Sequence, residues 1–112
     1  RRNIVSKVTE NIPNIEIDVF DGLLAEYVND HDFEAVVRGL RATTDFEYEI
    51  QMAQMNARLY TGGTETVFLM TDPRYSFISS SLIKEVVSYG GDVDGLLPDY
   101  ANEMIKTKVD NQ

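Results

Sequence analysis

The 112-residue sequence contains no cysteine, no tryptophan, one histidine and three prolines. The lack of cysteine excludes disulfides, thiolate metal ligands and cysteine nucleophiles. Basic residues are scarce: ten Lys and Arg stand against nineteen Asp and Glu, giving a net charge of -9. Such a surface does not favour sequence-independent binding of nucleic acid. No apolar run approaches the roughly 18 residues that a membrane span requires. We therefore expect no nucleic-acid or membrane partner, and a cytoplasmic protein.

The residues that are present are those of an ordinary globular domain, with 43% hydrophobic and 26% charged residues. Alternating Ile15, Ile17 and Val19 predict a half-exposed strand. Apolar runs without alternation at 33–39 and 64–70 predict two strands that are covered on both faces. Helical spacing or end signals predict helices at 4–8, 23–29, 44–60, 79–89 and 98–109. This alternation predicts an α/β fold, with a parallel sheet and helices on both faces.

Two arginines follow the apolar stretch Val36-Val37. Arg38 would end a buried strand at its carboxyl end, which is where ligands bind in parallel α/β sheets. Gly39 would let a ligand approach the backbone, and Arg41 follows one short turn later. Guanidinium groups bind phosphate in a bidentate manner, so this pattern predicts an anion site. The alternative is that both arginines pair with the acidic residues Asp45, Glu47 and Glu49.

Three consecutive serines, Ser79, Ser80 and Ser81, stand where a further helix is expected to begin. Their hydroxyls and the free amides of the first helical turn would form a second anion cradle. The alternative is simple N-capping by one serine. Thr44 and Glu47 have the spacing of a capping box for the preceding long helix, and its acidic first turns fit the helix dipole. Met52 and Met55 are expected in a core or a subunit contact.

Three stretches carry a resemblance to a known family: "VVRGLRATTDFEYEIQMAQMN", "YSFISSSLIKEV" and "GGDVDGLLP". Together they closely resemble bacterial phosphopantetheine adenylyltransferases, which are nucleotidyltransferases with a Rossmann-like fold. The resemblance implies a transferase of coenzyme A biosynthesis that joins ATP and 4'-phosphopantetheine and releases pyrophosphate. It also implies Mg²⁺ held mainly by the ATP phosphates, a homohexamer, and coenzyme A as a feedback ligand.

The same resemblance implies roles for individual residues. Leu24 and Arg38 match substrate-binding positions for the pantetheine arm and its phosphate. The matching ATP-binding positions fall in three places along the chain and comprise Gly39, Leu40, Arg41, Glu49, Tyr75, Ser76, Phe77, Ile78, Ser79, Ser80 and Ser81. No residue of the chain matches a catalytic or metal-binding position of the family.

The family's H-x-G-H motif, with its first strand-helix-strand unit, does not occur in this sequence. The one histidine, His31, is expected to be a solvated loop residue. We therefore expect residues 1–112 to be the C-terminal part of a single Rossmann-like nucleotidyltransferase domain, with little catalysis of its own. Two alternatives remain open: a noncatalytic nucleotide-binding or oligomerisation fragment, and a relative of nicotinate-mononucleotide adenylyltransferases.

Overall fold

The computed structural model describes residues 1–110, except the side chains of residues 43 and 44. The chain divides into two compact units. The first, Phe20–Phe77, is called here the sheet unit; the second, called the helical unit, combines Arg1–Val19 with Ile78–Gln112.

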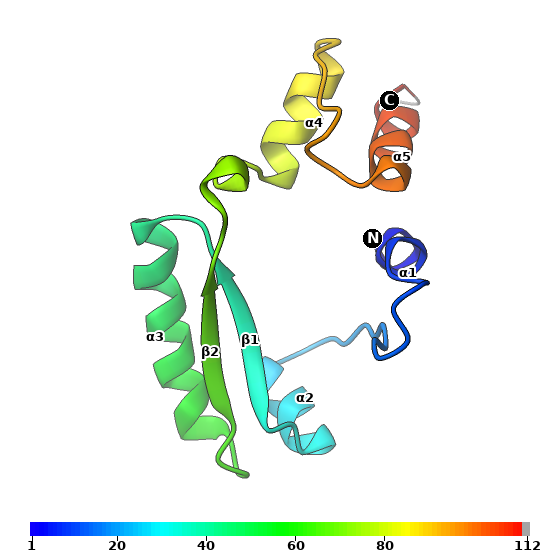
Figure 1. Cartoon of the computed structure of the whole chain (residues 1–112). Coiled ribbons are helices and arrows are strands. Elements are labelled where there is room, and N and C mark those ends of the chain that lie inside the picture. The colour runs from blue at the N-terminus through cyan, green and yellow to red at the C-terminus, as the bar shows by residue number, and fades with distance from the viewer. Residues whose placement is uncertain (111–112) are drawn as a thin grey trace. The chain divides into compact units, whose positions relative to one another are not determined.

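The sheet unit contains two helices, α2 (Leu24–His31) and α3 (Thr43–Leu59), and two strands, β1 (Ala35–Leu40) and β2 (Glu65–Met70). A short 3₁₀ turn, η1 (Pro73–Tyr75), follows β2. The strands pair in parallel, and α3 is the helix that connects them (Figure 1). This β-α-β order confirms the predicted α/β class and its parallel sheet.

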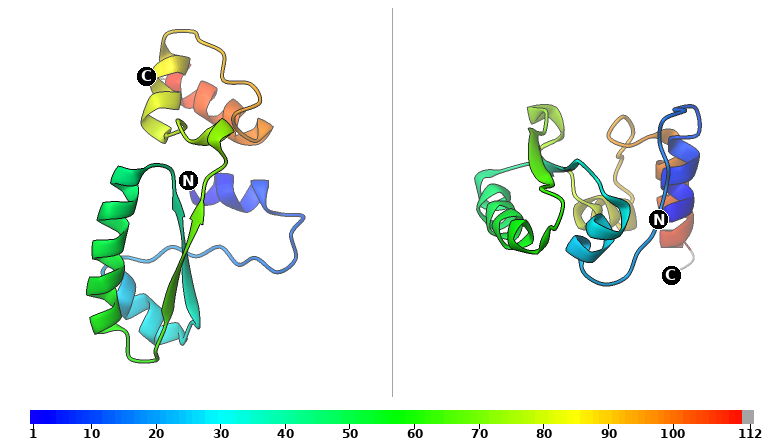
Figure 2. Two further views of the ribbon diagram at one scale, coloured as in Figure 1. Left: turned by 60° about the vertical axis from the view of Figure 1, so that its left-hand side comes forward. Right: turned by 90° about the horizontal axis from the view of Figure 1, so that it is seen from below.

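One face of the sheet carries the core of this unit. Ala25 and Val28 of α2 pack with Tyr60, which follows α3, and Val36 of β1 packs against them. In Figure 2, α2 and α3 lie on the same side of the two strands. The side chains of the other face are exposed, as shown by Val37 (60%), Val67 (43%) and Leu69 (59%).

The prediction that both strands are covered on both faces therefore differs from the structure, in which the side chains of that second face are exposed. Because successive strand residues point to opposite faces, a run of apolar residues supplies side chains for two layers of packing. Only one such layer is present in this unit.

Side chains of Asn29 and Thr64 connect the elements. The Asn29 amide donates to the carbonyl of Leu59 (2.9 Å), and its oxygen accepts from the backbone N–H of Thr61 (3.0 Å). The Thr64 hydroxyl donates to the carbonyl of Phe33 (2.8 Å). These bonds tie the end of α2 and the start of β1 to the loop that leads into β2.

The helical unit consists of α1 (Arg2–Val8), α4 (Ser80–Ser88) and α5 (Asp99–Asp110). Helix α5 packs against both α1 and α4. Ile83 and Val93 are buried, at 3% and 1% exposure. The N-terminus of α4 at the serines and its end before Gly90 confirm the predicted boundaries; Gly90 adopts a positive φ of 79°, as a residue after a helix end often does.

Residues 15–19 do not form the predicted strand. Ile15 is 42% and Val19 is 65% exposed, and the backbone N–H of Val19 donates to the Asp18 carboxylate (2.8 Å). Alternation of apolar residues is a strand signal only where a neighbouring strand can complete the hydrogen bonds. No such neighbour is present among the described residues.

The predicted capping box also does not cap α3. The helix begins at Thr43, with Ala42 in the capping position, so Thr44 already belongs to the first turn. The side chain of Thr44 lies outside the described residues. Throughout residues 1–110, no helix combines the length and the apolar character needed to cross a membrane.

Candidate functional site

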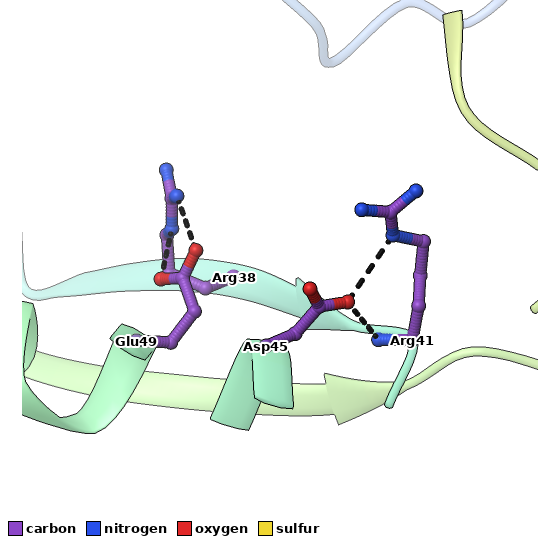
Figure 3. Close-up of polar contacts among 4 residues, drawn as sticks. All are labelled: Arg38, Arg41, Asp45 and Glu49. Atoms are coloured by element: carbon purple, nitrogen blue, oxygen red, sulfur yellow. Dashed lines mark hydrogen bonds and ion pairs between the residues drawn. The ribbon is translucent and has the colours of Figure 1, made fainter. Parts of the chain in front are cut away.

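Arg38 of β1 forms a bidentate ion pair with Glu49 of α3. Its Nε donates to Oε2 (2.9 Å) and its Nη2 donates to Oε1 (2.7 Å), as Figure 3 shows. The two residues are eleven positions apart, and they meet because α3 runs back along the strand that precedes it. The Glu49 side chain is only 14% exposed, whereas that of Arg38 is 47% exposed.

The ion pair shifts the ionisation of both partners in the direction that favours their charged forms. The hydrogen bonds from Arg38 lower the pKa of Glu49 below its usual value. The same bonds raise the already high pKa of Arg38. Near neutral pH, Glu49 is therefore an anion and Arg38 is a cation.

Arg41 lies just beyond β1 and pairs with Asp45 in the first turn of α3. Asp45 Oδ2 accepts from Arg41 Nε (3.2 Å) and from the Arg41 backbone N–H (3.2 Å), as Figure 3 shows. The alternative raised from the sequence, pairing of the arginines with acidic neighbours, is thus present for Asp45 and Glu49 but not for Glu47. In Figure 3 both guanidinium groups extend to the same side of β1.

A pocket of about 280 Å³ lies beside the Arg38–Glu49 pair, within the sheet unit. It brings together Leu24 and Arg38, the two residues that the resemblance places at the pantetheine substrate. Its other lining residues come from both strands, α3 and the neighbouring segments: Phe20, Val36, Tyr48, Glu49, Met52, Ala53, Asn56, Tyr60 and Thr66. The pocket is therefore largely apolar, with charged groups at Arg38 and Glu49.

Tyr60 and Asn56 add polar groups to this lining. Both are buried, at 9% exposure. Burial raises the pKa of the Tyr60 phenol, although the positive charge of Arg38 acts in the opposite direction. A neutral phenol and a neutral amide in an otherwise apolar wall are groups that can orient a polar ligand by hydrogen bonds.

Sequence reasoning placed Glu49 in the site but missed Tyr48, Met52, Asn56 and Tyr60. These four residues recur every four positions, so they lie along one stripe of α3 and its C-terminal extension. Met52, which was expected in a core or a subunit contact, is 41% exposed and is one of the residues that line the pocket. In the sequence, the signal for this stripe is the recurrence of apolar and polar residues every four positions, which places them on one helix face next to the strand.

Gly39 and Leu40 are the last two residues of β1 and lie between the two arginines in the chain. A side chain at Gly39 would meet no atom within 4 Å, so the backbone there is open to approach. Leu40 is buried at 5% exposure, and its carbonyl accepts from the N–H of Thr71 (2.8 Å).

The stretch Tyr75–Ser81 lies at the boundary between the two units. Tyr75 and Phe77 are exposed, and Ser76 donates its hydroxyl to the carbonyl of Pro73 (3.1 Å). Ser79 caps α4: its hydroxyl oxygen accepts from the N–H of Leu82 (3.2 Å). The N-capping alternative is thus confirmed for Ser79.

Ser80 and Ser81 are the first two residues of α4, and both are exposed. Within the described part of the chain, neither hydroxyl has a hydrogen-bond partner. The arginines belong to the sheet unit, whereas these serines and Ile78 belong to the helical unit. Convergence of the two groups on one ligand therefore stays a prediction.

His31 differs from the expected loop residue. It is the last residue of α2; its Nδ1 lies 2.8 Å from the carbonyl of Tyr27, and its ring is parallel to that of Phe33 at 5.3 Å between centroids. It is exposed, as predicted. Among the described residues, no cluster of three His, Asp or Glu side chains is arranged to hold a metal ion.

Comparison with known proteins identifies the family. A cytidylyltransferase-like family model matches residues 1–86. The phosphopantetheine adenylyltransferase of Caldanaerobacter subterraneus subsp. tengcongensis is 45% identical over 108 residues, which is 96% of this chain and 67% of that protein. The chain belongs to the phosphopantetheine adenylyltransferase family. The family's cytidylyltransferase-like match agrees with the parallel α/β arrangement of the sheet unit.

Two further phosphopantetheine adenylyltransferases give similar values. The protein of Clostridium novyi is 47% identical over 95% of this chain and 63% of its own length. That of Corynebacterium efficiens is 44% identical over 100% of this chain and 69% of its own length. The chain thus spans about two thirds of the length of the curated relatives that it matches.

Proposed function

We propose that the protein containing this chain transfers the adenylyl group of ATP to 4'-phosphopantetheine, forming dephospho-coenzyme A and pyrophosphate. The observation that carries the proposal is the pocket in the sheet unit, which places the Arg38 guanidinium beside an apolar lining that includes Leu24. Membership of the phosphopantetheine adenylyltransferase family supports the same reaction.

The shape and chemistry of the pocket suit this substrate. Phosphopantetheine is a narrow, flexible arm with methyl groups and amides, and it has a phosphate at one end. Apolar side chains such as Leu24, Val36 and Met52 can cover the arm, and Asn56 can form a hydrogen bond with an amide. Arg38 is the cation of the pocket and would bind the phosphate.

The reaction needs no covalent intermediate with the protein. A phosphate oxygen of phosphopantetheine attacks the α-phosphorus of ATP, a new P–O bond forms, and the bond to the pyrophosphate oxygen breaks. Catalysis of such an in-line transfer depends on positioning and on charges placed where negative charge develops. Arg38 would hold the attacking phosphate in line.

The family resemblance implies that the ATP phosphates would be bound by residues at the end of β1 and at the start of α4. Arg41 would supply a cation, and Ser80 and Ser81 would supply hydroxyls and free helix amides. Gly39 and Leu40, together with residues 75–79, would complete the nucleotide site as the family resemblance implies. Mg²⁺, held mainly by the phosphates, would neutralise part of their charge.

Further parts of the proposal come from the family resemblance. They are a cytoplasmic location, assembly as a homohexamer, and binding of coenzyme A as a feedback ligand.

The proposal is tested by pyrophosphate release from ATP in the complete protein, with 4'-phosphopantetheine or with pantetheine, which lacks the phosphate. We expect turnover only with the phosphorylated compound. Arg38→Ala should lower kcat/KM for phosphopantetheine by roughly 10- to 100-fold, since about 1.5–3 kcal/mol of charged hydrogen bonding is lost. Unchanged kinetics would refute the role of Arg38.

Arg58→Ala is the matched control. Arg58 is an exposed arginine of α3 that forms no ion pair with any described residue. This variant should leave the kinetics unchanged. ATP binding without turnover by the complete protein would instead support the noncatalytic alternative.

A further inference from the structure

Glu49 occupies only one edge of the Arg38 guanidinium. A guanidinium group has five N–H donors in one plane, and Glu49 accepts from Nε–H and from one N–H of Nη2. The second N–H of Nη2 and both N–H groups of Nη1 point away from this edge. Of these, the second N–H of Nη2 and the adjacent N–H of Nη1 form a second edge that can bind phosphate through two parallel hydrogen bonds.

The two partners differ in how firmly they are placed. Glu49 is 14% exposed and lies on α3, a helix of 17 residues, whereas Arg38 is 47% exposed on the terminal half of β1. Figure 3 shows the guanidinium beyond the Glu49 carboxylate, with its free nitrogen directed away from the strand. The carboxylate is thus the fixed partner, and the arginine is the partner that faces solvent and the pocket.

We propose that Glu49 is a positioning residue, which holds Arg38 by one edge so that the other edge is presented to the phosphate of the substrate. The inference rests on the proposed function, because it takes the phosphate of phosphopantetheine as the ligand of Arg38. It gives Glu49 a role that differs from the ATP contact expected from the family resemblance.

Two opposite effects of Glu49 on phosphate binding can be separated. As an anion, Glu49 repels the phosphate, and its removal would strengthen binding. As an anchor, it removes the large rotamer freedom of a long side chain before the ligand arrives, and its removal would weaken binding. The bidentate contact with Arg38 already neutralises most of the carboxylate's charge, so we expect anchoring to dominate.

The measured quantity is the phosphate preference, defined as the Kd for pantetheine divided by the Kd for 4'-phosphopantetheine. Both constants are obtained by isothermal titration calorimetry on the complete protein. The ratio cancels effects on the apolar arm and reports only the contribution of the phosphate. Three substitutions of Glu49 separate the effect of its side-chain length from the effect of its charge.

Glu49→Ala removes both the long side chain and its charge. Glu49→Asp keeps the charge but shortens the side chain by one methylene. Both should lower the phosphate preference about tenfold, which corresponds to loss of about one favourable charged contact. Glu49→Gln keeps the length and one acceptor oxygen, so its preference should stay within about threefold of the original. The KM for phosphopantetheine should rise in parallel, and the KM for ATP should not.

Glu47 provides the matched control. It lies two residues earlier on α3, is exposed, and forms no ion pair with a described residue. The same three substitutions at Glu47 should leave the phosphate preference unchanged. Thermal unfolding of every variant establishes that it is folded, and if Glu49→Ala does not fold, the comparison of Asp with Gln is sufficient.

Three results would overturn the inference. An unchanged phosphate preference in Glu49→Asp, or a raised phosphate preference in Glu49→Ala, would show that the charge of Glu49, and not its anchoring of Arg38, determines phosphate binding. A raised KM for ATP with an unchanged phosphate preference would make Glu49 a nucleotide contact. Failure of the proposed function would look different: the unaltered protein would show no phosphate preference, and Arg38→Ala would not change it.

Discussion

The two units of the chain provide positive potential for an anion in different ways. The sheet unit uses guanidinium groups, Arg38 and Arg41, each of which is already bound to a carboxylate of α3. The helical unit has no arginine at the start of α4 and offers the N–H groups of a helix N-terminus and the hydroxyls of Ser80 and Ser81.

The difference teaches how an acidic protein can bind anionic ligands. Side-chain cations need neighbouring anions to fix their direction, and these neighbours add to the negative net charge of -9. Helix amides are fixed by the backbone and need no counter-charge. An overall negative charge is therefore compatible with local anion sites of either type.

The largest effect is expected for the most deeply buried valine of each unit, since Val28 and Val93 are both 1% exposed. Val28→Ala and Val93→Ala should each lower the free energy of unfolding by about 2–3 kcal/mol, measured by urea denaturation. Only Val28→Ala should also weaken pantetheine binding, because Val28 supports α2 and thereby Leu24. Equal loss of binding in both variants would show that the pocket depends on the helical unit as well.

The next effect concerns two glycines with opposite surroundings. A Cβ at Gly91 would meet Val86 Cγ1 at 2.5 Å and the Val86 carbonyl oxygen at 3.1 Å, whereas at Gly39 nothing lies within 4 Å. Gly91→Ala should therefore cost about 1–3 kcal/mol of stability. Gly39→Ala should cost almost nothing, and should weaken ligand binding instead. Thermal unfolding measures both, and a stable Gly91→Ala variant would contradict the packing described for α4.

A smaller effect separates the serines of α4. Ser79→Ala removes the N-cap bond to Leu82 and should lower stability by about 1 kcal/mol. Ser80→Ala and Ser81→Ala remove no such bond, so they should leave stability unchanged and raise the KM for ATP. If ATP kinetics were unaffected while stability fell in all three variants, the serines would have only a structural role.

The smallest effect is a pH dependence in the sheet unit. Because the folded-state pKa of Glu49 is lowered, its stabilising effect is complete above the usual glutamate value of about 4.3 and is lost as the pH falls through the folded-state pKa. Glu49→Gln should thus be less stable by about 1 kcal/mol at pH 7, a modest value since Arg38 is half exposed. Urea denaturation between pH 7 and pH 3 should show the difference disappearing at the acid end; a constant difference would contradict the assignment.

Local signals in the sequence predicted most of the elements. Helices α3 and α4 ended shortly before the glycine pairs at 62–63 and 90–91, α4 began at a serine cap, and the apolar runs at 33–39 and 64–70 became β1 and β2. These features depend on residues close together in the chain, where propensity and capping act directly. The alternating residues 15–19 failed because a strand also needs a partner, and a partner is not a local property.

The candidate site was predicted only in part for the same reason. Leu24 came from the family resemblance alone, Arg38 from its position after a predicted strand and from the resemblance, and the structure places both at one pocket. The pairing of Arg38 with Glu49 depends on how α3 lies along β1, which fixes one acidic residue of several as the partner. Spacing alone could not distinguish Glu49 from Glu47, although only Glu49 faces the strand.

Arg38 is proposed to bind Glu49 with one edge of its guanidinium group and a phosphate with the other, and this restricts how the site can evolve. A lysine at position 38 would keep the positive charge, but its ammonium group has no second planar edge and could not serve the carboxylate and a phosphate in fixed directions at once. Positions 38 and 49 are therefore expected to change together or not at all when homologous sequences diverge. A lineage that lost the acid at 49 would need a different anchor for the arginine.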